Sequence, residues 1–114
     1  MYIVDRQTFI EHPEGTLFSE FEPNIFGPLC IKGCSIVFED GNDFCYQEIA
    51  DALYYTHSGD LHDKLTEAVD RGTQLKMDFH CEGRDGCFEY NQPYAVWDKQ
   101  DVQQLIDRLQ ECVK

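Results

Sequence analysis

Apolar side chains recur every three or four residues in the middle of the chain and again near its C-terminal end. This spacing is typical of amphipathic helices, in which one stripe faces the core. The middle helix is expected over about 60–71, with Ser58 or Asp60 as its N-cap and Gly72 as its stop. Its apolar stripe consists of Leu61, Leu65, Ala68 and Val69.

The C-terminal helix is expected over about 99–112. Asp98 is suited to its N-cap, and Asp101 three residues later supports its first turn. Its apolar stripe consists of Val102, Leu105, Ile106, Leu109 and Val113. A third, short helix is expected over 6–11, with Asp5 as its N-cap.

Runs of β-forming and alternating residues between turn signals predict several strands. The expected strands are 15–22, 29–33, 35–40, 43–49, 73–81 and one or two within 87–98. The stretch 43–55 also fits a helix, a turn is expected at 39–43, and 23–28 is expected to be a loop. Together these elements predict an α+β fold of one domain, 1–114. We expect a mainly antiparallel sheet of about 5–6 strands, with the middle and C-terminal helices packed on one face.

The stretch "FHCEGRDGCFEY", 79–90, carries two cysteines on either side of a Gly-Arg-Asp-Gly sequence. Asp and Gly are the residues that a tight turn favours, so the stretch predicts a β-hairpin with Gly83 to Gly86 as its turn. Cys81 and Cys87 would then face each other across the two strands. The tip, 82–86, is expected to project as a charged recognition loop.

The net charge of the chain is −13, from 22 acidic and 9 basic residues. This excess argues against direct binding to nucleic acid, which needs Lys and Arg to displace counterions, and against binding to an anionic membrane surface. It favours a cationic partner: a metal ion, a basic protein, or a protein surface that normally holds nucleic acid. A soluble acidic protein of another role fits the same composition.

Two groups of charged residues are the candidates for binding such a partner. They are Asp60, Asp63, Glu67 and Asp70 on one face of the middle helix, and Glu82, Arg84, Asp85 and Glu89 in the 79–90 loop. The four helix acids span roughly 15 Å at 1.5 Å per residue and are spaced loosely like phosphates. The alternative is an ordinary solvated helix face.

The six cysteines are expected to be free thiols in the cytoplasm. The first residues lack the pattern of a signal peptide, and no run approaches the roughly 20 apolar residues of a membrane span. The alternative is a small zinc-binding module, whose candidate ligands are Cys30, Cys34, His80, Cys81 and Cys87. No other cofactor is expected. No local signature pairs a cysteine with a histidine base, so we expect no enzymatic activity.

Three stretches of the chain resemble small acidic accessory proteins of phages and prophages. They are "PEGTLFSEFEPNIFGPLCIKG", "DFCYQEI" and "GRDGCFEYNQPYAVWDKQDVQQLIDRL". Many such proteins inhibit host defence, among them anti-CRISPR proteins and anti-restriction proteins that mimic DNA. The resemblance therefore implies a binding protein without catalysis, which blocks a basic nucleic-acid-binding surface of a host complex in the host cytoplasm. It implies no residue-level site, and both a monomer and a homodimer are compatible with it.

Overall fold

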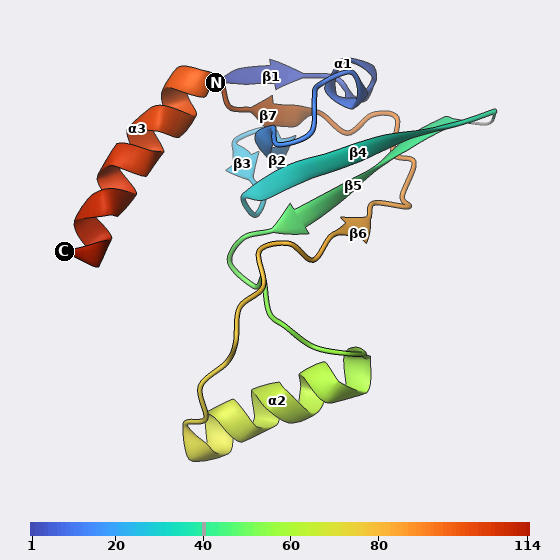
Figure 1. Ribbon diagram of the computed structural model, residues 1–114. Coiled ribbons are helices and arrows are strands. Elements are labelled where there is room, and N and C mark those ends of the chain that lie inside the picture. The colour runs from blue at the N-terminus through green and yellow to red at the C-terminus, as the bar shows by residue number, and fades with distance from the viewer. Residues whose placement is uncertain (40) are drawn as a thin grey trace.

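A mainly antiparallel sheet forms the centre of the molecule (Figure 1). The structure is a computed structural model that describes residues 1–39 and 41–114. Within these residues the strand order is β1-β7-β2-β4-β5-β6, with β3 paired to β2 alone. The strands are β1 (Tyr2–Val4), β2 (Leu17–Glu22), β3 (Ile25–Phe26), β4 (Cys30–Phe38), β5 (Gly41–Glu48), β6 (Gly83–Arg84) and β7 (Tyr94–Val96).

The longest ladder of the sheet joins β4 and β5. The two strands expected at 29–33 and 35–40 are one strand, β4, which is interrupted by a bulge where the register shifts between Lys32 and Ser35. The buried Lys32 ammonium stabilises this bulge by donating hydrogen bonds to the Gly33 carbonyl oxygen at 3.2 Å and to Ser35 Oγ at 2.7 Å.

The strand expected at 43–49 is confirmed as β5. The turn expected at 39–43 includes Asp40, which lies outside the described residues. Its later part belongs to β5, because Gly41 pairs with Phe38 across the ladder. The loop expected at 23–28 contains the short strand β3, which folds back on β2.

The described residues form three α-helices: α1 (Arg6–Ile10), α2 (Ser58–Arg71) and α3 (Lys99–Gln110), which continues into the 3₁₀ turn η1 (Glu111–Val113). Asp5 caps α1, and Asp98 caps α3 in a reciprocal capping box with Asp101, as the sequence predicts. Gly72 ends α2 in the left-handed conformation, at φ 68°. None of these helices is long and apolar enough to cross a membrane, and this holds for all residues that the structure describes.

The N-cap of α2 differs from the expectation of Ser58 or Asp60. His57 takes this position, and its Nδ1 accepts a hydrogen bond from the backbone N–H of Asp60 at 3.1 Å. The Asp60 carboxylate instead accepts from the Thr56 backbone N–H at 2.9 Å and pairs with Lys64 at 3.1 Å. The imidazole nitrogen therefore provides the cap that a hydroxyl or carboxylate usually provides.

The α+β class and the antiparallel sheet are confirmed, although the two long helices cover little of the sheet (Figure 1). Phe9 of α1 is fully buried against the strands. No residue of α2 or α3 is fully buried, and Val69 and Leu109 in their apolar stripes are 85% and 52% exposed. The sheet core is therefore built without the apolar faces of the two long helices.

Four aromatic side chains make up most of that core: Phe9, Phe18, Phe44 and Tyr94. Phe9 stacks on Tyr94 with ring centroids 4.2 Å apart, and it meets Phe18 and Phe44 at 4.5 and 5.0 Å. Aromatic pairs at these distances add to the stabilisation that burial of their area gives. The short helix α1 thus connects three strands through one ring.

A cluster of charged residues, here called the core ion cluster, lies beside these rings and consists of Arg6, Asp43, Arg84 and Asp85. Arg6 is only 4% exposed. Its Nη1 donates to the Tyr94 hydroxyl at 2.8 Å and to Asp85 Oδ2 at 3.2 Å, and its Nη2 donates to the Asn42 carbonyl oxygen at 3.1 Å. One guanidinium therefore joins α1 to β5, to β7 and to the segment after β6.

Asp43 is the fully buried acceptor of the core ion cluster. Its carboxylate accepts hydrogen bonds from Arg84 Nε at 2.6 Å and from the backbone N–H groups of Phe44 and Gly86 at 2.8 and 3.1 Å. Burial by itself raises the pKa of Asp43, but these hydrogen bonds outweigh burial and lower the pKa below its usual 3.8. The ionised form is therefore the form that the fold stabilises.

The hairpin expected at 79–90 and the strand expected at 73–81 are both wrong. In the first part of this segment Met77 forms an isolated bridge with Leu53. In the second part, β6 pairs with β5, so that Arg84 lies opposite Cys45. The local turn signal of Gly-Arg-Asp-Gly is overridden because Arg84 and Asp85 find buried partners of opposite charge in the core ion cluster. The expected projecting tip is therefore partly a core element.

We predict that Asp43→Ala lowers the free energy of unfolding by about 3–5 kcal/mol at neutral pH, because it leaves buried donors and a guanidinium without their acceptor. The control is Asp63→Ala on the exposed face of α2, which should change the free energy of unfolding by no more than about 0.5 kcal/mol. Urea unfolding measures both. The low pKa of Asp43 means that its contribution is present above pH 3.8 and is lost as the pH falls below that value. Equal stabilities of the two variants at neutral pH would contradict the buried role of Asp43.

Candidate cation-binding pocket

On each of two strands, an aromatic and an acidic side chain stand two positions apart and therefore point to the same face of the sheet. Successive side chains of a strand point to opposite faces, which places Phe18 with Glu20 on β2, and Tyr46 with Glu48 on β5. Between them lies a small cavity, here called the acidic pocket, of about 130 Å³. It is lined by Phe18, Glu20, Pro28, Cys30, Phe44, Tyr46, Glu48 and Asp85.

Two carboxylates of the acidic pocket are held where their charge is unfavourable. Partial burial raises the pKa of Glu20 above its usual 4.5, the charges of Asp85 and Glu22 raise it further, and Arg6 offsets this only in part. Partial burial likewise raises the pKa of Glu48, and the neighbouring Asp51 adds to the effect. For both glutamates partial burial is the largest cause of the raised pKa, and the neighbouring carboxylates are the smaller cause.

The same field acts on the other ionisable groups of the pocket wall. Burial, followed by the charges of Glu48 and Glu20, raises the pKa of the Cys30 thiol to about 12. Burial and then Glu48 and Asp85 raise the pKa of the Tyr46 hydroxyl. Cys30 is therefore a neutral thiol at physiological pH and is unsuited to nucleophilic attack, which requires the thiolate.

Asp85 differs from the two glutamates because it has a cation of its own. Its side chain is 6% exposed and is paired with Arg6 Nη1 at 3.2 Å. The Arg6 guanidinium also lies 5.3 Å from the centroid of the Phe44 ring. The Arg6 guanidinium is thus held between the Asp85 carboxylate and the Phe44 ring. The other acids of the pocket, Glu20 and Glu48, lie beside Tyr46 and would offer a similar combination of charge and ring to a second cation.

The acidic pocket is suited to the head group of a cationic side chain. Its volume is about four times the roughly 30 Å³ that one water molecule occupies in the liquid. Ring faces attract cations through their quadrupoles, and carboxylates add charge-assisted hydrogen bonds. An Arg or Lys head group fits this chemistry and this size, whereas a nucleotide is too large and carries the wrong charge.

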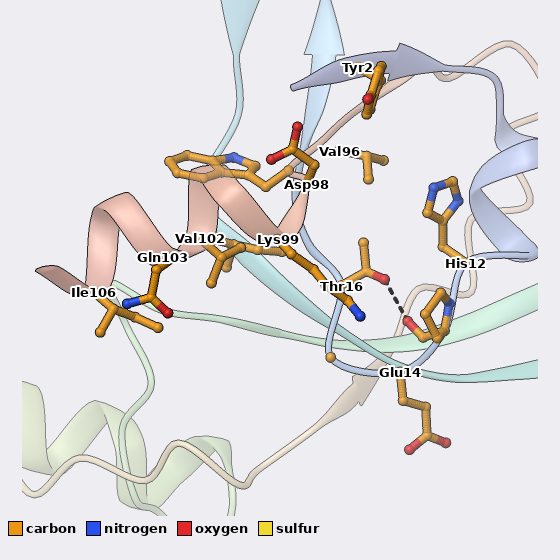
Figure 2. Close-up of a pocket in the computed structure, with 14 residues that line it drawn as sticks. Tyr2, His12, Glu14, Thr16, Val96, Asp98, Lys99, Val102, Gln103 and Ile106 are labelled. Atoms are coloured by element: carbon orange, nitrogen blue, oxygen red, sulfur yellow. Dashed lines mark hydrogen bonds between the residues drawn. The ribbon is translucent and has the colours of Figure 1, made fainter.

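A wider groove of about 460 Å³ lies between α3 and the segment before β2 (Figure 2). Its walls include Tyr2, His12, Trp97, Val102 and Ile106, and one rim is fixed by the hydrogen bond from Thr16 Oγ1 to the Pro13 carbonyl oxygen at 2.7 Å. The residues 99–114 carry three acidic and three basic side chains, so the whole net charge of −13 belongs to the residues before them. The groove itself is lined by Glu14, Asp98 and Lys99, so it carries less negative charge than the acidic pocket with its three acids.

The predicted partner-binding acids of the middle helix lie on α2, away from the acidic pocket (Figure 1). Asp63, Glu67 and Asp70 are exposed, and Asp60 is engaged with Thr56 and Lys64. The hydrogen bond from the Thr56 backbone N–H, followed by that from Lys64, lowers the pKa of Asp60. The α2 acids thus form a second acidic surface, whose role in binding stays a prediction.

The predicted residues of the 79–90 loop do not form one surface. Asp85 is buried, and half-exposed Arg84 pairs with Asp43. The Glu82 carboxylate lies close to Gly33 on β4, whereas Glu89 is exposed. Of these four residues, Asp85 lines the acidic pocket.

The two pocket glutamates, Glu20 and Glu48, are absent from the residues that the sequence singled out. Their signal is the repeated pattern of an aromatic residue, one intervening residue and a glutamate, in Phe18 to Glu20 and in Tyr46 to Glu48. Each pattern is unremarkable by itself. They become a site only when β4 brings β2 and β5 into one sheet.

The candidate metal ligands are also dispersed. Cys30 is buried at the acidic pocket, and Cys34 lies beside Cys45. Cys81 and Cys87 are exposed free thiols, and His80 is exposed as well. Within residues 1–39 and 41–114, no three His, Cys, Asp or Glu side chains are arranged to hold a metal ion. The zinc hypothesis therefore has no ligand set in this part of the chain.

Comparison of the chain with protein-family models, with curated proteins and with solved structures finds no match. The resemblance to phage accessory proteins stays a prediction. The geometry of the acidic pocket is the firmest basis for a functional proposal.

We predict that Glu48→Gln stabilises the protein at about pH 7, measured as a higher midpoint of urea unfolding. An acid whose pKa is raised by folding contributes stability below pH 4.5 and loses it as the pH rises through the folded value, so the ionised form is the unfavourable one at neutral pH. The difference from the unaltered protein should vanish at about pH 3, where Glu48 is protonated in both states. Glu67→Gln on exposed α2 is the control and has little effect at either pH. Destabilisation by Glu48→Gln at neutral pH would show that the charge of Glu48 is compensated.

Proposed function

We propose that the chain is a non-enzymatic protein-binding module, in which the acidic pocket takes up a cationic side chain from a basic partner protein. One observation carries the proposal: exposed Glu20 and half-buried Glu48 line one pocket with Tyr46, and partial burial, with neighbouring carboxylates as the smaller cause, raises the pKa of both glutamates. A bound Arg or Lys head group would neutralise the charges of both glutamates. It would also lower both pKa values toward their ordinary range.

The expected occupant is an arginine more readily than a lysine. A guanidinium is planar, stacks on ring faces and donates several hydrogen bonds in a fixed fork, whereas an ammonium is a compact and strongly hydrated charge. Half-buried Tyr46 provides the accessible ring of the pocket, the buried Phe18 and Phe44 form its inner wall, and the two glutamates provide acceptors. The pocket would thus favour arginine on an acidic surface that otherwise attracts any cation.

The net charge of −13 supports the same class of partner over a longer range. A strongly acidic protein is steered toward a basic surface, and this steering weakens as salt is added. The exposed acids of α2 would contribute to it without a shaped pocket. Protein surfaces that normally hold nucleic acid are the most basic ones available. In that setting the resemblance to phage accessory proteins suggests an inhibitor of a host-defence complex, acting in the host cytoplasm as a monomer or homodimer.

We predict that the protein binds an acetylated hexa-arginine peptide and that the double variant Glu20→Gln/Glu48→Gln weakens this binding by at least about tenfold, which corresponds to about 1.4 kcal/mol. Isothermal titration calorimetry at low and at high salt measures it. Binding should fall with salt, and it should be weaker for hexa-lysine than for hexa-arginine.

The matched control is Asp63→Asn/Glu67→Gln on α2, which removes the same two charges outside the pocket. It should weaken binding much less than the pocket variant does. No binding at low salt would remove the proposal. Equal losses in the two variants would reduce it to an effect of net charge.

A further inference from the structure

Two cysteines meet between the two longest strands of the sheet. Cys34 on β4 and Cys45 on β5 have their sulfur atoms 3.6 Å apart, and both are free thiols. The bulge in β4 produces this approach. Lys32 pairs with Tyr46 and Ser35 pairs with Phe44, so Gly33 and Cys34 together oppose the single residue Cys45.

The two thiols lie on the sheet face opposite the acidic pocket. Side chains alternate along β5, so Cys45 points away from the face that carries Phe44 and Tyr46. Both cysteines are half-buried, so neither is enclosed in the core as Cys30 is. The Glu82 carboxylate lies next to Gly33 and adds negative charge near Cys45.

The other four cysteines are placed differently. Cys30 is buried in the acidic pocket, whereas Cys81, Cys87 and Cys112 are exposed. The pair expected from sequence to face each other, Cys81 and Cys87, flanks β6 and does not belong to a hairpin. Cys34 and Cys45 are therefore the pair whose geometry is set by the bulge within the β4–β5 ladder.

We propose that Cys34 and Cys45 form a reversible dithiol–disulfide site that reacts with small disulfides such as oxidised glutathione. A disulfide bond is about 2.05 Å long, so the sulfur atoms must approach by about 1.5 Å from their present 3.6 Å. The bulge places Cys34 opposite Cys45 on neighbouring strands, so rotation of the two side chains and a small adjustment of the bulge would close the bond.

The reaction balances with oxidised glutathione as its oxidant. One protein thiol loses its proton and attacks a glutathione sulfur, which breaks the glutathione disulfide and releases one glutathione thiolate. The second protein thiol loses its proton and attacks the mixed disulfide, which releases the second glutathione. The two protein thiols together give up two electrons and two protons, and these convert one oxidised glutathione into two glutathione thiols.

Burial and the contact with Cys34 raise the pKa of the Cys45 thiol, and Glu82 and Asp43 add to the effect. The Cys45 thiol is therefore neutral at rest, and it accepts a weak hydrogen bond from Cys34 Sγ. This proposal stands on the bulge and the sulfur distance and does not depend on the proposed cation binding. Its consequence is a covalent tie between β4 and β5, and β5 also carries Tyr46 and Glu48 of the acidic pocket.

The test exposes the fully reduced, full-length protein to buffers with defined ratios of reduced to oxidised glutathione, followed by acid quenching, alkylation and mass spectrometry. The expected product has lost two hydrogen atoms, and peptide mapping links Cys34 to Cys45. Its urea midpoint should be higher than that of the reduced protein, because the bond restricts the unfolded chain. Cys34→Ser and Cys45→Ser should each give a glutathione mixed disulfide on the remaining thiol.

Cys112→Ser is the matched control, and it should form the Cys34–Cys45 link as the unaltered protein does. Peptide mapping of the unaltered protein decides the question without variants, should a serine variant fold poorly. The proposal is overturned if Cys34 and Cys45 both remain open to alkylation while the exposed cysteines carry glutathione. A link between any other two cysteines would overturn it as well.

Discussion

The rest of the structure depends on the hydrogen bonds and ion pairs that the Arg6 guanidinium makes in the core. A buried cation is tolerated only where opposite charges and hydrogen-bond acceptors surround it, and Arg6 finds these in Asp85, Asp43, the Tyr94 hydroxyl and the Asn42 carbonyl oxygen. These partners come from segments far apart in the sequence. The same residue therefore ties α1 to β5, to β7 and to the segment after β6, beside the aromatic core.

The core ion cluster also determines which charges are left for a partner. Arg6 and Arg84 compensate Asp43 and Asp85, and the pKa of Asp43 is low as a result of its hydrogen bonds. Glu20 and Glu48 lie just beyond this compensation, and their pKa values rise. Folding thus separates the acids into an inner pair that is matched by Arg6 and Arg84, and an outer pair of glutamates whose pKa values partial burial and neighbouring carboxylates raise. The outer pair lies beside Tyr46, which is what turns general acidity into a shaped binding site.

Local patterns in the sequence were enough to predict elements whose signals are local. The cap at Asp98, the stop at Gly72, the strand of β5 and the α+β class all follow from residues within a few positions of one another. The segment 79–90 was misjudged because its turn residues are ordinary, whereas the partners of Arg84 and Asp85 are about 40 and 79 positions away in the chain. For the same reason the pocket glutamates were missed. Their significance depends on strand order, which no short window of sequence contains.

The most direct test of this account is a titration of the side-chain carboxyl groups by carbon-detected NMR in the free protein. The account predicts that Asp43 titrates below its ordinary pKa of 3.8, whereas Glu20 and Glu48 titrate above 4.5. Addition of hexa-arginine should then lower the pKa values of both glutamates and leave Asp43 unchanged. Glutamates that titrate at or below 4.5 in the free protein would contradict the account, because the pocket would hold no uncompensated charge for a partner to neutralise.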